Sequence, residues 1–193
     1  MITRMAQHTA TRFAKKNFYS STEVNVYQYG FELLFSTILN ALGLFAISLI
    51  IGTPIHMLLF VAAFIPLRLT AGGYHAKHHW SCFLSMNITY LCFAMLLHCI
   101  PNAWLQPYIF STLIISVILI VLLAPVDAIN KPLSDKKKLR LRKQSITIIS
   151  SYMAVVVVLG FLQQPAGLYG AYFASGYFAA SISLAAAVLS KER

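Results

Sequence analysis

The sequence has very little charge for its length. Only 10% of its 193 residues are Asp, Glu, Lys or Arg, whereas a soluble domain carries about a quarter. Hydrophobic residues make up 59%, and acidic residues are scarcer than basic ones, at 5 against 15. This composition excludes a disordered chain and a soluble nucleic-acid-binding protein, so no nucleic-acid partner is expected. It indicates an integral membrane protein with a cationic polar surface.

Cysteine is also scarce. Cys82, Cys92 and Cys99 are odd in number and lack a Cys-x-x-Cys spacing, which excludes a disulfide framework and gives no sign of a redox pair. We interpret Cys92 and Cys99 as small apolar packing residues. No cofactor is expected.

Three long stretches contain no charged residue at all: 33–67, 78–126 and 144–190. Each is much longer than the about 20 residues of one helical crossing, and each has Gly or Pro near its middle, where a helix stops and the chain reverses. The sequence therefore predicts an all-α integral membrane protein of about six transmembrane helices in three hairpins. The predicted spans are 31–51, 54–71, 82–100, 106–124, 145–162 and 168–189.

The basic residues predict the topology. They fall in the N-terminal arm, in the connections after the second and fourth spans, and at the C-terminus, and none falls in a hairpin turn. Because short loops rich in Lys and Arg stay in the cytoplasm, both termini are expected to be cytoplasmic in the cell membrane. We expect one membrane domain over 1–193, with a cationic arm at 1–30 and a basic cytoplasmic connection at 125–144.

The beginning of the arm has an amphipathic pattern. Ile2, Ala6, Ala10 and Phe13 share one side of a helix, and basic residues share the other. This predicts a helix lying in the headgroup region, with a loosely ordered arm as the alternative.

The residues that suggest chemistry gather in the segment 68–82, which we predict to be a catalytic loop. His75 and Cys82 form a candidate base and nucleophile, because a neighbouring imidazole is the usual means of generating a thiolate. Cys82 is expected to open the third span, with Ser81 as a cap, where the helix dipole favours the thiolate. On one straight helix the pair would stand about 10.5 Å apart, and proton transfer needs about 3–4 Å. Gly72 and Gly73 would allow a folded loop.

Two further features of this segment have competing interpretations. Arg68 lies inside the second span, and an ionisable residue there is a functional candidate; the alternatives are snorkelling to the headgroups or a pair with Glu32.

His75, His78, His79 and Cys82 follow an i, i+3, i+4, i+7 spacing that suits zinc ligands. Four ligands on a single helix cannot easily surround a zinc ion in tetrahedral geometry, so we do not predict a metal site.

The pattern Arg-x3-Gly-Gly-Tyr-His-Ala, followed by Cys seven residues after the His, resembles the AgrB (accessory gene regulator B) family. Length, hydropathy and the segment from Ala124-Pro125 to Lys131-Pro132 agree with it. The resemblance implies a membrane cysteine endopeptidase of peptide quorum sensing that acts on an AgrD-like precursor. By analogy Cys82 attacks a peptide bond with His75 as base, and the resulting thioester closes into a thiolactone or lactone autoinducing peptide. A homodimer is also implied.

The resemblance suggests roles for other residues. Arg68, or backbone N–H groups around Gly72 and Gly73, would stabilise the oxyanion or contact the substrate. The basic cluster would bind the acidic precursor tail or anionic lipid; its members are Lys131, Lys136, Lys137, Lys138 and Arg140. The competing functions are a non-enzymatic peptide transporter, for which the spans offer few polar residues, and a zinc-dependent membrane hydrolase using the histidine cluster.

Overall fold

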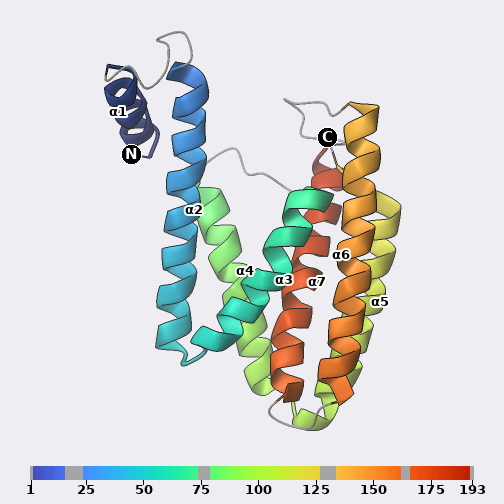
Figure 1. The fold of residues 1–193 in the computed structure, drawn as a ribbon. Helices are drawn as coiled ribbons and strands as arrows, with labels where there is room; N and C mark the ends of the chain where they lie inside the picture. The colour runs from blue at the N-terminus through green and yellow to red at the C-terminus, as the bar shows by residue number, and fades with distance from the viewer. Residues whose placement is uncertain (1, 16–23, 74–78, 127–133, 162–165, 192–193) are drawn as a thin grey trace. The chain divides into compact units, whose positions relative to one another are not determined.

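The computed structural model describes residues 2–15, 24–73, 79–126, 134–161 and 166–191, and this part of the chain is helical and contains no strand (Figure 1). The predicted all-α class is confirmed. The helices, in chain order, are α1 (Ile2–Lys15), α2 (Val24–Ile50), α3 (Pro54–Ala71), α4 (His79–Cys99), the short 3₁₀ helix η2 (Asn102–Trp104), α5 (Leu105–Leu123), α6 (Asp135–Phe161) and α7 (Ala166–Lys191).

Five of the described helices are long and apolar enough to cross a membrane, which makes the chain a multi-pass membrane protein. They contain the candidate spans Val24–Ile50, Pro54–Ala71, Trp80–Cys99, Asn102–Leu123 and Gly167–Ser190. Helix α6 covers most of the remaining predicted span, 145–162. The total of six spans stays a prediction.

Two helices begin seven or more residues before the predicted start of their spans. Helix α2 starts at Val24 instead of 31, and α6 starts at Asp135 instead of 145. The sequence predicted each span to begin at its apolar part. In α6 the residues before that part are mostly Lys, Arg and Leu, which are strong helix formers. Ser134 begins α6, because the Lys138 N–H donates to the Ser134 carbonyl at 2.9 Å. Most of the basic cluster expected in a connection therefore lies on a helix.

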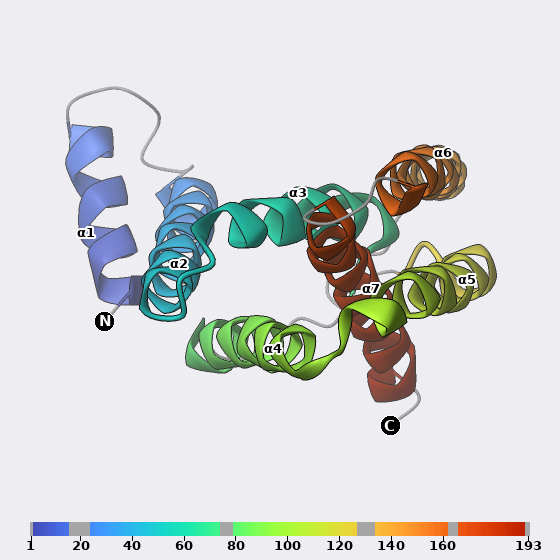
Figure 2. The same cartoon turned by 90° about the horizontal axis from the view of Figure 1, so that it is seen from below.

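The chain divides into two compact units: Met1–Ile47 with Ala76–Ile88, and Ser48–His75 with Thr89–Arg193. In the second unit α7 contacts α3, α5 and α6, and both views show it between α3 and α5 (Figures 1 and 2). Its small residues allow this close packing: at Gly176 an added Cβ would collide with the Phe60 carbonyl of α3. The largest fully buried side chains of this unit include Phe60, Leu67, Tyr90, Ile109 and Tyr177.

Polar side chains link the helices of the second unit. The Tyr108 hydroxyl on α5 and the Ser175 hydroxyl on α7 are 2.6 Å apart, and the Tyr177 hydroxyl donates to the Ile109 carbonyl at 3.2 Å. Such bonds help to hold helices together in lipid, where the hydrophobic effect between them is lost.

A tight turn joins α2 to α3. Gly52 has a φ of +70°, which glycine adopts without strain, and the Thr53 N–H donates to the Ser48 carbonyl at 2.7 Å. Pro54 follows at the start of α3, where a missing N–H costs no helical hydrogen bond. The turn predicted between the first two spans is therefore present.

In the first unit, α1 is the helix expected in the arm. Ala6 and Ala10 are fully buried, and the Phe13 ring lies 5.7 Å from that of Phe31 on α2. Part of its apolar side is thus covered by protein, while Arg4 and Arg12 are exposed. A location of α1 in the headgroup region stays a prediction.

Candidate functional site

Helix α3 ends at the double glycine. Arg68 lies in its last turn, and the Gly72 N–H donates to the Arg68 carbonyl at 3.1 Å. Gly72 and Gly73 have φ angles of +83° and +156°, a region that side-chain-bearing residues rarely adopt. The sequence thus stops the helix at the first residues of the segment that we singled out for chemistry.

The Arg68 guanidinium is held at this corner. Its Nη1 donates a hydrogen bond to the Ser183 hydroxyl of α7. A Cβ added at Gly73 would overlap Nη1 and would lie 3.0 Å from the Ser183 Oγ. The cationic group therefore packs directly on the Gly73 backbone, and a side chain at position 73 would displace it.

A third segment reaches the same corner from the end of α5. The Val126 N–H donates to the Ala71 carbonyl at 3.1 Å, which satisfies one of the carbonyls that a helix leaves open at its C-terminus. A Cβ at Gly72 would approach the Val126 carbonyl oxygen to 2.8 Å. The end of α3, Ser183 of α7 and the segment after α5 thus form one junction of the second unit.

The candidate nucleophile belongs to the first unit. Cys82 lies in the first turn of α4 and is partly buried. Ser81 lies inside this helix, which begins at His79, so the prediction that Ser81 caps it is wrong. The expected position of Cys82 at the beginning of a helix is confirmed.

The other two cysteines differ from expectation. Cys92 and Cys99 are free and exposed on the surface of α4, so they are not the packing residues that we predicted. On a membrane-spanning helix such small, weakly polar side chains are compatible with lipid.

Two histidines of the predicted site, His75 and His78, fall outside the described residues. Among the residues that the structure does describe, no three His, Cys, Asp or Glu side chains gather as metal ligands would. Because three of the four side chains of the predicted zinc set lie outside this part, both the dyad and the zinc alternative stay hypotheses.

The basic cluster lies mainly on the first turns of α6. Lys136, Lys137 and Arg140 are exposed and Lys138 is partly buried, whereas Lys131 is outside the described residues. Arg142, further along, donates to the Val121 carbonyl of α5 at 3.3 Å. The basic side chains of the cluster therefore form an exposed surface on the first turns of α6 that an anion can reach.

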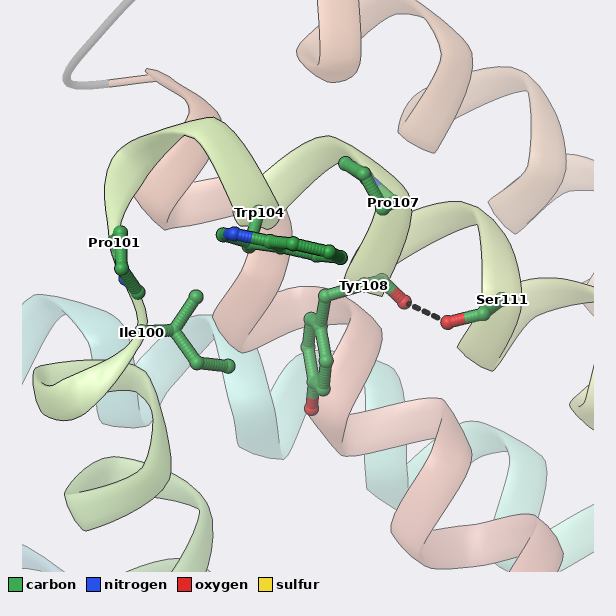
Figure 3. Close-up of a pocket in the computed structure, with 6 residues that line it drawn as sticks. All are labelled: Ile100, Pro101, Trp104, Pro107, Tyr108 and Ser111. Atoms are coloured by element: carbon green, nitrogen blue, oxygen red, sulfur yellow. Dashed lines mark hydrogen bonds between the residues drawn. The ribbon is translucent and has the colours of Figure 1, made fainter.

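A pocket opens at the other end of α5, with a volume of about 540 Å³ (Figure 3). It is lined by Ile100, Pro101, Trp104, Pro107, Tyr108 and Ser111. The Ser111 hydroxyl is used within the wall, since it donates to the Tyr108 carbonyl at 3.0 Å. This apolar lining has no nucleophile or base and is not the candidate site.

Sequence reasoning missed Ser183 and Val126. Val126 bonds Ala71 through its backbone N–H, which almost every residue type has, so its identity in the sequence gives no sign of this contact. Ser183 is one of several serines in α7. The predicted spans give one hint of its contact with Arg68, because both residues lie shortly before the expected cytoplasmic ends of their spans and so at a similar depth in the membrane.

Comparison with known proteins gives matches over most of the chain. The sequence model of a family described as Accessory gene regulator B matches residues 6–189. A putative AgrB-like protein of Clostridium perfringens strain SM101 is 25% identical over 167 residues, covering 82% of this chain and 77% of that protein. Protein FsrB of Enterococcus faecalis is 27% identical over 121 residues, covering 62% of this chain and 49% of that protein. No solved structure matches the chain.

Proposed function

Because this chain belongs to the accessory gene regulator B family, we propose that it is a membrane cysteine endopeptidase of peptide quorum sensing. Its substrate is an AgrD-like precursor peptide, which it cuts on the C-terminal side and helps to cyclise. The observation that carries the proposal is the position of Cys82 at the N-terminal end of α4. Free N–H groups and the helix dipole favour an anion there, whereas Cys99 lies at the opposite end of this helix.

The reaction begins when the Cys82 thiol gives its proton to His75 and the sulfur attacks the carbonyl carbon of the scissile peptide bond. The C–N bond of the tetrahedral intermediate then breaks, and the leaving amine takes the proton from His75. The C-terminal tail departs, and the rest of the precursor remains as a thioester on Cys82.

The second half of the reaction closes the ring. A Cys or Ser side chain within the precursor attacks the thioester carbonyl, loses its proton to the base, and forms a thiolactone or lactone. The Cys82 sulfur leaves and recovers the proton. Water would hydrolyse the thioester instead, so a site at the membrane edge favours cyclisation by excluding it.

In this proposal Arg68 stabilises the oxyanion. A guanidinium keeps its charge inside a membrane segment and presents several N–H donors in a fixed plane. Preorganised donors of this kind stabilise the charge that develops on the carbonyl oxygen in the transition state. The contact of Arg68 with Gly73 supports this role, because Gly73 precedes His75 by only two positions in the sequence.

The test uses the purified full chain in lipid vesicles with a synthetic precursor. The sequence of this precursor is taken from the short reading frame expected beside the gene of this protein, which should encode an amphipathic start, a central Cys or Ser and an acidic end. We expect Cys82→Ala to abolish cleavage, and Cys92→Ser and Cys99→Ser to keep it. Cleavage by Cys82→Ala would refute the proposal. Loss of cleavage with a chelator but not with thiol alkylation would indicate a zinc enzyme. Movement of uncut precursor across the vesicle membrane would indicate a transporter.

A further inference from the structure

We propose that Ser183 is the positioning residue of Arg68: its hydroxyl fixes the guanidinium in the orientation that the cleavage reaction requires. The inference rests on the proposed function, because it assigns Arg68 a role in the transition state. It adds a residue from α7, a helix to which the sequence assigned no part in the chemistry.

The first argument is the way in which the guanidinium is confined. Ser183 accepts a hydrogen bond from Nη1, and the Gly73 backbone lies so close that even a methyl group at this position would overlap the nitrogen. An arginine side chain loses about 2 kcal/mol of rotamer entropy when it is ordered. Contacts that order it before substrate arrives remove this cost from the reaction.

The second argument comes from another serine of α7. The Ser181 hydroxyl donates to the Tyr177 carbonyl of its own helix at 2.9 Å, as serines in helices commonly do. The hydroxyl of Ser183 instead accepts from a residue 115 positions earlier in the chain. Its bond therefore joins two helices.

The third argument is the chemistry of the acceptor. A serine hydroxyl accepts the guanidinium N–H through a directional hydrogen bond, so it fixes the orientation of the group.

The experiment measures kcat and KM for cleavage of the synthetic precursor by the full chain in vesicles. We expect Ser183→Ala to lower kcat about ten- to hundredfold, the loss typical of one hydrogen bond to a charged group, with KM within about twofold. Ser183→Thr keeps a hydroxyl and should restore most of the rate. Ser181→Ala is the matched control on the same helix, since its hydroxyl bonds only within α7 among the contacts described above, and it should leave kcat unchanged.

A double-mutant cycle with Arg68→Ala separates positioning from packing. If Ser183 acts through Arg68, then Ser183→Ala has no further effect on kcat once Arg68→Ala is present. Independent, multiplying losses in the two variants would overturn the inference. So would a Ser181→Ala loss equal to that of Ser183→Ala, a loss confined to KM, or a Ser183→Thr variant as slow as Ser183→Ala. None of these outcomes touches the proposed nucleophile, which the Cys82→Ala variant tests separately.

Discussion

At the scale of single residues, Gly72 and Gly52 form a matched pair. Both have positive φ, at +83° and +70°, but an added Cβ at Gly52 would meet nothing within 4 Å, whereas at Gly72 it would approach the Val126 carbonyl oxygen to 2.8 Å. Gly52→Ala should cost about 1–2 kcal/mol of stability from its backbone conformation alone. Gly72→Ala should cost more, because the Val126 segment must also move.

Thermal unfolding of the two variants in detergent measures this difference. The larger fall in melting temperature is expected for Gly72→Ala, together with a lower cleavage rate. Equal falls would show that the Val126 contact contributes nothing, and the junction at the end of α3 would then lack the packing that we assign to it.

The residues of the candidate site differed in how far the sequence could reveal them. Arg68 and Cys82 were found because their chemistry is unusual in an apolar chain, and the double glycine because a helix stops there. Depth in the membrane alone does not distinguish Ser183 from its neighbours, since serine is common in membrane helices and its partner is far away in the sequence. Its role depends on which side of α7 faces α3, and packing decides that.

At the scale of helices, α3 contains an interior proline that its neighbour compensates. Pro66 has no N–H, so the Ala62 carbonyl loses its usual helical partner. The Tyr152 hydroxyl of α6 donates to that carbonyl at 3.2 Å. We expect Tyr152→Phe to lower the free energy of unfolding by about 1 kcal/mol, measured by denaturation in detergent micelles.

Pro66→Ala provides the control for this prediction. It returns an N–H to α3 that can bond the Ala62 carbonyl, so Tyr152→Phe should cost less in the Pro66→Ala background. An equal cost in both backgrounds would show that the tyrosine stabilises by packing alone; its ring lies 4.9 Å from that of Phe173.

The basic surface on α6 is also a property of a helix. We expect it to anchor the protein to anionic lipid, at about 1 kcal/mol per residue. Replacing Lys136, Lys137 and Arg140 with Gln should then reduce the extra thermal stability that phosphatidylglycerol gives over phosphatidylcholine, and should leave the KM of the precursor within about twofold. A large rise in KM, absent with a precursor whose acidic tail is neutralised, would show that the surface binds the tail instead.

Hydropathy predicted the helices well and their starts less well. The start of α3 at Pro54 follows from a turn with Gly and Pro, whereas α6 begins ten residues before its apolar part. Charge marks where a helix leaves the membrane, and the helix itself continues as long as its residues favour it.

At the scale of the whole molecule, the distribution of lysine and arginine predicts which ends of the helices face the cytoplasm. In a chain without native cysteines, Asn102→Cys in the turn between α4 and α5 should react with an impermeant maleimide added outside intact cells. Lys137→Cys on α6 should react only after the cells are opened. The opposite pattern would invert the topology and place Cys82 on the wrong side for a cytoplasmic precursor.

The central claim is that Cys82 carries the precursor as a thioester. The most direct measurement is the intact mass of the protein after incubation with a precursor whose ring-forming Cys or Ser is replaced by Ala, so that the intermediate accumulates. We predict a mass increase equal to the N-terminal part of the precursor, located on Cys82, released by hydroxylamine and absent from Cys82→Ala. Cleavage without such an adduct, or with the adduct on another residue, would contradict the account.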